Sequence, residues 1–338
     1  MRRPAILAVD GGGSKLDAVF LRRDGTVLGV ARVKPSMWDG SDEHLDDVER
    51  AIRAAARDAA LDVDRRPLAE IGVFCLAGAD LPSDERRIAR GLRKRGLSDH
   101  DVVRNDTFAV LRAGTDRAWG VAVVCGYGTN CSAVSPDGRV TRFPAIGPIS
   151  GDWGGASELG ASAAWHAVRS EDGRGVKTSL EREVPAHFGL KRPRQLVEAI
   201  HHGRIDEGRL AELAPTLFRA AASGDAVARD LVDRQADEIV AMSTTAIRRL
   251  GMTKLDPDVV LGGGIFRNDD RSFFARIDAG VRAVAPRATA RRLTAPPIVG
   301  AAQIGLDLAG ASVGAKRRAR LALTHDRITH HTRRRRDS

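Results

Sequence analysis

The chain of 338 residues is 43% hydrophobic and 29% charged, and it carries a formal net charge of +10. This length fits two domains or one large α/β domain, and the composition allows a large buried core. We expect neither a membrane span nor a signal peptide, because no apolar run is long enough and the first one ends at Asp10 without a cleavage site.

The cysteines and the charge distribution narrow the class of protein further. Cys75, Cys125 and Cys131 lie in or beside apolar runs, so we expect reduced, buried thiols and a cytoplasmic protein. Residues 315–338 hold nine Lys or Arg and two Asp, a net +7, which leaves only +3 for the rest of the chain. Such a segment predicts a disordered basic tail, and attraction to nucleic acid or to a membrane is the less favoured interpretation.

Taken in chain order, the first predicted elements are strands. Residues 5–32 are apolar strands separated by a glycine-rich turn and a second turn at Asp24-Gly25. Residues 119–143 repeat this arrangement, with their second turn at Asp137-Gly138 and nearly the same spacing. The repeat predicts an internal duplication and two similar domains.

The elements between and after the repeats are mainly helical. Hydrophobic spacing predicts a helix over residues 42–58, and a strand that ends at Asp106 passes into another helix. The remaining predicted elements are a strand at 71–77, a basic surface helix at 84–95, helices over most of 155–251, a strand before Gly262 and a closing helix within 296–309.

Three glycine-rich turns, Gly11–Gly13, Gly126–Gly128 and Gly262–Gly264, each follow an apolar strand. Glycines let consecutive backbone N–H groups approach a ligand, and such nests favour phosphates. Ser14 and Thr129 follow the first two turns and can add hydroxyl donors. The sequence has no complete Walker or dinucleotide fingerprint and no zinc spacing, so the prediction is a phosphate site of another type.

Two aspartates end strands where catalytic side chains tend to be exposed. Asp10 precedes the first glycine turn, and a carboxylate beside a phosphate nest indicates Mg²⁺, held here through water. Asp106 suits a general base that accepts a hydroxyl proton as a phosphoryl group arrives.

These residues resemble a known family. D-G-G-G-S-K at 10–15, G-Y-G-T-N at 126–130 and L-G-G-G at 261–264 are similar to the two phosphate motifs and the adenosine motif of the sugar-kinase, actin and Hsp70 superfamily. Within it the chain most resembles the BadF/BadG/BcrA/BcrD-type ATPases, and there the N-acetylglucosamine kinases. Further matches are R-N-D at 104–106, S-P-D-G at 135–138, G-D-W-G-G-A at 151–156, A-A-S-G-D at 221–225 and P-x-x-G-A at 297–301.

The resemblance implies an α/β fold of two ribonuclease-H-like, actin-like ATPase domains with Mg·ATP in a cleft between them. The expected domains are residues 1–116, with the helix at 298–312 packed back on them, and residues 117–297 with a helical insertion. For the nucleotide it implies Gly12, Gly13, Ser14, Lys15, Tyr127, Gly128, Gly263, Gly264 and Asn268, with Asp10 at the metal. For the sugar it implies Ser36, Trp38, Asn105, Thr129, Asn130, Gly147 and Asp152, with Asp106 as the base.

Departures from the family pattern gather on the sugar side. Ser36 stands where an Asn is usual, 144–147 replace a Gly-Gly-Trp-Gly, and Trp153 and Gly155 replace the Glu and Ser of G-D-E-G-S. A pocket that reads its substrate by buried hydrogen bonds is sensitive to such changes. N-acetylglucosamine, glucosamine, N-acetylmuramic acid and another modified hexose therefore stay open as substrates, and so does pairing of two chains.

Two other functions stay open at this point. Some members of the resembled family are ATPases that drive electrons into reductases through an iron–sulfur cluster, and the three cysteines are the only candidate ligands here. A nucleotide-binding module without catalysis is the third interpretation.

Overall fold

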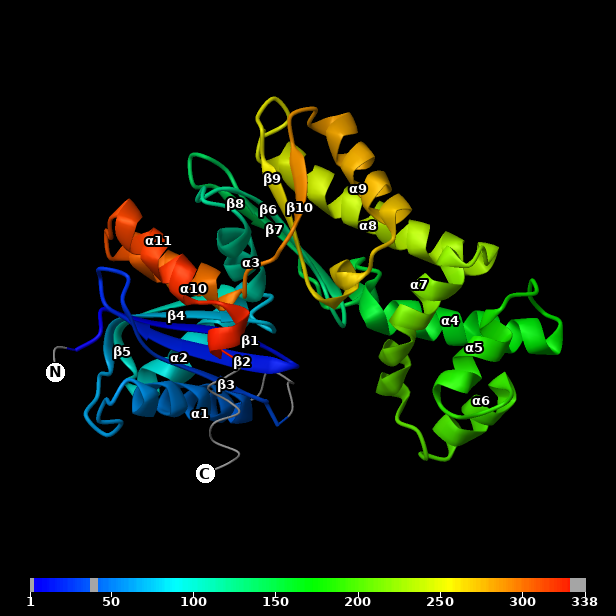
Figure 1. Ribbon diagram of the computed structural model, residues 1–338, viewed down its shortest axis with the longest axis horizontal. Helices are drawn as coiled ribbons and strands as arrows, with labels where there is room; N and C mark the ends of the chain where they lie inside the picture. The colour runs from blue at the N-terminus through cyan, green and yellow to red at the C-terminus, as the bar shows by residue number, and fades with distance from the viewer. Residues whose placement is uncertain (1–2, 37–41, 329–338) are drawn as a thin grey trace. The chain divides into compact units, whose positions relative to one another are not determined.

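The computed structural model describes residues 3–36 and 42–328, and Figure 1 shows their helices and strands. The chain divides into two units, the first made of residues 1–120 and 293–338 and the second of residues 121–292. The C-terminal segment therefore belongs with the N-terminal sheet. None of the helices in the described part of the chain is both long enough and apolar enough to cross a membrane.

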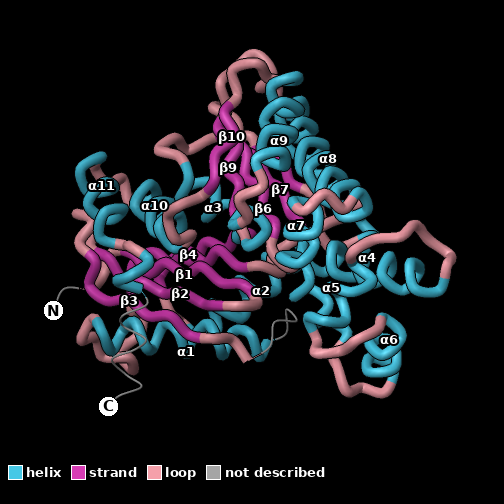
Figure 2. The backbone as a smooth tube through the Cα atoms, turned by 45° about the vertical axis from the view of Figure 1, so that its right-hand side comes forward, coloured by secondary structure: helices cyan, strands magenta, loops and turns pink. Residues whose placement is uncertain are grey.

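The first unit is built on a five-stranded sheet of order β3-β2-β1-β4-β5. Strands β1, β2 and β3 form antiparallel hairpins, whereas β1, β4 and β5 run parallel. Figure 2 shows β4, β1, β2 and β3 side by side. The bounds are β1 Ile6–Gly12, β2 Lys15–Leu21, β3 Val27–Val33, β4 Ala69–Leu76 and β5 Ser98–Asn105.

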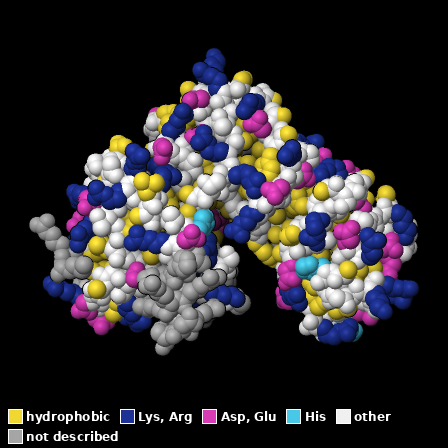
Figure 3. Space-filling view, viewed as in Figure 1, with side chains coloured by type: hydrophobic (Ala, Val, Ile, Leu, Met, Phe, Trp, Pro, Cys, Tyr) yellow, Lys and Arg dark blue, Asp and Glu magenta, His cyan; other side chains and the backbone are white. Residues whose placement is uncertain are grey.

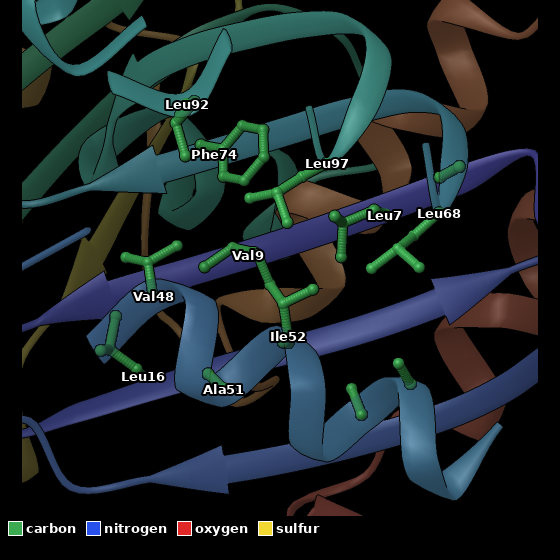
Figure 4. Packing of buried hydrophobic residues seen from close by; sticks show 14 of the residues in the cluster. Leu7, Val9, Leu16, Val48, Ala51, Ile52, Leu68, Phe74, Leu92 and Leu97 are labelled. Carbon is green, nitrogen blue, oxygen red and sulfur yellow. The ribbon is translucent and has the colours of Figure 1, made fainter. Parts of the chain in front are cut away.

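Helices cover both faces of this sheet. Helices α1 (Asp42–Asp58) and α2 (Pro82–Arg95) contribute to one buried cluster, in which Val48 and Ile52 of α1 pack with Leu7 and Leu16 of the sheet (Figure 4). The pattern predicted for 42–58 thus forms a helix whose apolar face is buried, which stabilises it more than local propensity does.

The opposite face is covered by α3 (Asp106–Gly114), α10 (Ile298–Leu308) and α11 (Val313–Ala322). Helices α3 and α10 approach closely, because a Cβ added to Gly300 would lie 1.8 Å from the backbone oxygen of Ala109. Small residues at this contact let the segment near 300 return to the first sheet.

The expectation of a disordered tail from residue 315 is wrong for the part that the structure describes. Ala315 and Ala319 of α11, followed by Leu323 and Ile328, are buried in the cluster on this face. Arg320 donates hydrogen bonds to the backbone oxygens of Arg112 and Ala113. This Arg-rich segment therefore forms a helix with a small apolar face that is buried. Residues 329–338 lie outside the described part of the chain.

The second unit repeats the topology of the first. Its sheet has the order β10-β9-β6-β7-β8, so β6, β7 and β8 correspond to β1, β2 and β3, with two further strands on the other side. Strands β6, β9 and β10 run parallel. The predicted duplication is confirmed, and so is the fold class of two α/β domains of the actin-like type. The strands are β6 Gly120–Cys125, β7 Thr129–Val134, β8 Val140–Arg142, β9 Asp258–Gly262 and β10 Thr289–Arg292.

Helices fill the remainder of the second unit. An insertion between β8 and β9 contains most of them, and α8 packs against both β7 and α9. They are η1 Pro148–Ser150, α4 Gly155–Asp172, α5 Leu180–His187, α6 Pro193–His201, η2 Glu207–Leu213, α7 Ala214–Ala222, α8 Ala226–Arg249, η3 Gly264–Arg267 and α9 Arg271–Val284. On the face shown in Figure 3, Lys and Arg alternate with Asp and Glu instead of forming one basic patch.

Candidate active site

The first glycine turn joins β1 to β2 as a tight hairpin. Gly12 pairs with Lys15, which leaves Gly13 and Ser14 at the tip. A Cβ on Gly11 would lie 2.2 Å from the side chain of Leu16, so a larger residue there would force that side chain to move. A Cβ on Gly12 would have its nearest neighbour at 3.9 Å, which leaves room for a ligand to approach the backbone there.

Lys15 is bound to two carboxylates rather than free beside the turn. Its Nζ lies 3.0 Å from Asp10 Oδ2 and 3.0 Å from Asp17 Oδ2. Asp17 is fully buried and also accepts from Arg32, whose Nε lies 2.6 Å from Oδ1. Burial disfavours the charged ammonium, yet Asp10 and Asp17 outweigh it and raise the pKa of Lys15.

Asp17 and Arg32 are functional candidates that the sequence reasoning missed. Asp17 lies among apolar residues of β2, Arg32 is the one charged residue of β3, and the two are register partners. A buried charge in a strand needs a partner, so their pairing was the available signal. They hold Lys15 beside Asp10.

Three carboxylates gather at the carboxyl ends of β1, β4 and β5. Asp10 is near the end of β1, Asp80 follows β4, and Asp106 begins α3 directly after β5. Burial, and next to it the charges of Asp10 and Asp80, raise the pKa of Asp106 to about 7. Burial also raises the pKa of Asp10, against the effect of Lys15. A carboxyl group with a pKa near neutrality is suited to accept a proton at physiological pH.

Asn105 organises this edge. Its Oδ1 accepts from the backbone N of Thr107 at 3.0 Å and from the Thr107 hydroxyl, which makes it the N-cap of α3. Its Nδ2 donates to Asp80 Oδ1 at 2.8 Å. Both polar atoms of this predicted sugar residue are thus engaged in fixing Asp80 and the start of α3.

The residues of this edge fit a hard divalent cation. Mg²⁺ usually binds through one or two carboxylates together with phosphate oxygens and water, so a cage of protein ligands is not required. Within residues 3–36 and 42–328, no group of three His, Cys, Asp or Glu side chains could hold a metal alone. Asp10, beside the open backbone of Gly12, offers the oxygen donor that such an ion prefers.

The second glycine loop, Gly126–Gly128 between β6 and β7, is held by the first turn of α4. The backbone N of Ala156 donates to the Gly126 oxygen at 2.8 Å, and the N of Ser157 donates to the Tyr127 oxygen at 3.0 Å. A trans peptide points its C=O and the following N–H in opposite directions. The N–H groups of Tyr127 and Gly128 therefore point away from α4, and the Tyr127 side chain is 66% exposed.

The third glycine turn lies at the same edge of the second sheet. Strands β6 and β9 are parallel neighbours, with Val124 opposite Gly262. Gly263 has φ 109°, and a Cβ there would lie 2.3 Å from the Cys125 oxygen. Asn268 closes the turn, because its Nδ2 donates to the Ile265 oxygen and its Oδ1 accepts from the N of Asp270. Gly264 has no neighbour within 4 Å of an added Cβ.

The predicted sugar residues of the second unit are close to the second loop in sequence. Thr129 is buried, with its hydroxyl 3.2 Å from Cys125 Sγ, and Asn130 follows it on β7. Asp152 is buried and accepts from the Ser150 hydroxyl. Gly147, at φ 90°, precedes η1, and its backbone oxygen lies 2.9 Å from that same hydroxyl.

Ser36, another predicted sugar residue of the first unit, is bound to helix α1. The backbone N and the hydroxyl of Ser36 both donate to Asp47 Oδ2, at 2.7 and 2.8 Å. Trp38 lies outside the described residues.

The three thiols are buried and free, as expected. Burial raises the pKa of Cys75 and Cys131, and it raises that of Cys125 to about 12. Metal clusters bind thiolates, so such thiols are poor candidates for a cluster ligand.

Two sheets of one strand order, each with a glycine loop at the turn after its first strand, define a duplicated α/β protein of the actin-like ATPase type. The chain belongs to the BadF/BadG/BcrA/BcrD ATPase family, whose profile matches residues 7–305. The family resemblance drawn from the motifs is confirmed.

Two curated relatives and a solved structure match between 78% and 91% of this chain. An N-acetylmuramic acid/N-acetylglucosamine kinase from Clostridium acetobutylicum is 27% identical over 78% of this chain and 86% of its own length. An N-acetyl-D-glucosamine kinase from Dictyostelium discoideum is 24% identical over 91% of this chain and 99% of its own. A structure from Chromobacterium violaceum, provisionally named N-acetylglucosamine kinase, has a TM-score of 0.69 at 22% identity, covering 90% of this chain and 99% of that one. This last likeness establishes the fold.

Proposed function

We propose that the protein is an ATP-dependent kinase that transfers the γ-phosphoryl group to a hydroxyl of N-acetylglucosamine or a related amino sugar. The single observation that carries the proposal is the position and acidity of Asp106. It follows β5 at the same edge as the first glycine turn, and its pKa is raised to about 7 by burial and by Asp10 and Asp80. The named activities of the two relatives support the same conclusion.

Asp106 would act as the general base. In its ionised form it would accept the proton of the sugar hydroxyl as that oxygen forms a bond to the γ-phosphorus and the bond to the β-phosphate oxygen breaks. Asn105 and Thr107 fix the start of α3, so they would orient this carboxylate. Since chemistry of this kind depends mainly on positioning, a rigid helix start is an appropriate site for the base.

The glycine loops would bind the nucleotide. The backbone of Gly12 and Gly13 with Ser14 would hold the β- and γ-phosphates, and the outward N–H groups of Tyr127 and Gly128 would bind the same part of the nucleotide. Gly263 and Gly264 would lie along the adenosine, and Asn268 would hold the shape of their turn. Mg²⁺, bound through Asp10 and water, would supply neutralisation of the phosphate charge.

Lys15 has a different role in this proposal from the one first expected. Because Asp10 and Asp17 both bind it, Lys15 would act first by keeping Asp10 in place. Asp152, Thr129, Asn130 and Gly147 would bind the sugar, and the altered sequence around Trp153 leaves the choice among amino sugars to experiment.

The test is an ADP-release assay with N-acetylglucosamine, glucosamine, N-acetylmuramic acid and plain hexoses as acceptors. We expect sugar-stimulated ADP release, and we expect D106N to lower kcat by at least about a hundredfold while ATP still binds. Asp101 on β5, a partly buried carboxylate bonded to Ser98, provides the control D101N, whose kcat should stay near that of the wild type. Sugar-independent hydrolysis alone, or unchanged turnover in D106N, would refute the proposal.

A further inference from the structure

Gln235, on α8, is bound to the segment that supports the second glycine loop. Its side chain is fully buried, and its Oε1 accepts from the backbone N of Gly155 at 2.7 Å. Gly155 is the first residue of α4, and the next two residues hold the loop carbonyls. The first three amides of α4 are therefore all engaged, one by Gln235 and two by the loop.

The contacts among Gln235, the start of α4 and the second glycine loop leave no free space. A Cβ on Gly154 would lie 2.5 Å from Gln235 Oε1, and a Cβ on Gly155 would lie 2.4 Å from the Tyr127 oxygen. Both glycines have positive φ, 120° and 82°. Gln235, the two glycines and the loop are thus stacked in contact, so a shift of the Gln235 amide would be passed to the loop.

The nitrogen of the Gln235 side-chain amide helps to identify the role of this residue. Its Nε2 is buried and has no hydrogen-bond partner among the described residues. A buried donor without a partner destabilises the fold, so Nε2 gives no reason for an amide side chain at this position. The bond from Gly155 to Oε1 is the contact that accounts for a polar side chain here.

We propose that Gln235 is a positioning residue for nucleotide binding, which fixes the Gly126–Gly128 loop through Gly155. The inference rests on the proposed function, because it assumes that this loop binds the β- and γ-phosphates of ATP. Gln235 touches no substrate in this scheme. It aligns the outward N–H groups of Tyr127 and Gly128, and backbone donors that are aligned in advance bind an anion without a cost of ordering.

The test compares ATP with AMP, which lacks the phosphates that the loop would bind, by titration calorimetry on the full chain. Q235M keeps the volume but removes the acceptor, and we expect it to weaken ATP binding by about tenfold or more, as for the loss of a buried hydrogen bond. AMP binding should change by less than about twofold, because AMP makes no contact with the aligned donors. The unfolding temperature should stay near the wild-type value, since one unpartnered polar atom replaces another.

Matched variants separate positioning from a general loss of structure. Q235E keeps an acceptor for Gly155, and burial would hold the new carboxyl in its protonated form, so ATP binding should recover relative to Q235M. Ser243, also buried on α8, bonds only within its helix, and S243A should leave both affinities unchanged. Ser157, whose hydroxyl donates to the Tyr127 oxygen at 2.8 Å, gives a milder variant at a half-buried site, and S157A should also weaken ATP more than AMP.

Two results would overturn the inference: ATP binding near the wild-type value in both Q235M and S157A, or equal weakening of ATP and AMP in both. A wild-type protein that binds no ATP would overturn the proposed function as well. ATP binding and sugar phosphorylation that are insensitive to Q235M and S157A would overturn the role of Gln235 alone.

Discussion

Replacing the proposed base with a neutral isostere should make the protein more stable while it lowers kcat. In the folded protein burial and the charges of Asp10 and Asp80 raise the pKa of Asp106 from 3.8 to about 7. The folded state therefore holds this proton more tightly than the unfolded state does. Between pH 4 and pH 7 the ionisation of Asp106 lowers the stability progressively, and above pH 7 the penalty is constant.

The size of the effect follows from the shift. About three pKa units correspond to about 4 kcal/mol as an upper limit, and partial exposure of the site reduces the expected gain to about 2 kcal/mol. D106N removes the penalty, so its free energy of unfolding should exceed that of the wild type by about this amount at pH 8. At pH 4, where the wild-type carboxyl is protonated in the folded state, the two proteins should differ little.

The assay is urea denaturation at pH 4, 6 and 8. Asp64, whose side chain is 86% exposed, provides the control, and D64N should show no pH-dependent gain. The contrary results are a D106N protein that is no more stable than the wild type at pH 8, or one that is more stable by the same amount at all three pH values. Either result would show that the folded state does not disfavour the ionised form of Asp106.

Other perturbations test the remaining parts of the structure. Below an apparent pKa of about 7, kcat/KM should fall tenfold per pH unit, and a flat profile from pH 5 to 8 would exclude Asp106 as the base. Truncation after Ser312 should lower the free energy of unfolding by about 3 kcal/mol or more, through loss of buried Leu and Ile contacts, and an unchanged urea midpoint would mean that α11 contributes nothing. D17A leaves the Arg32 guanidinium without its carboxylate and should cost about 3–5 kcal/mol, measured in the same way, whereas a neutral result would indicate that solvent replaces the pair. G263A should displace the end of β9, because the new Cβ would meet a backbone oxygen at 2.3 Å, and calorimetry should show weaker AMP binding; wild-type affinity would place the nucleoside elsewhere.

Local patterns were sufficient for much of the fold. Alternating apolar strands with glycine turns predicted the two β-meanders, and helical spacing predicted α1, because each pattern matches the face that the element buries. The spacing of the two meanders predicted the duplication, and the two sheets share their strand order. The motif residues themselves predicted the family.

Charge density was a poor guide where an amphipathic face decided the outcome. The segment after residue 315 is rich in Arg, which indicates a solvated end. Ala315, Ala319, Leu323 and Ile328 nevertheless form an apolar stripe, and burial of that stripe against the first sheet stabilises α11. Only the tertiary structure supplies the surface that such a stripe covers.

The sequence by itself determined the family, the two β-meanders with their duplication and the glycines that let backbone amides meet a ligand, since these depend on neighbours along the chain. Only the tertiary structure decided which polar groups meet: Lys15 with Asp10, Asp106 with Asp10 and Asp80, and Gln235 with Gly155. These contacts join residues from different strands, helices and loops. Their energies depend on distance and burial, and a linear sequence contains neither.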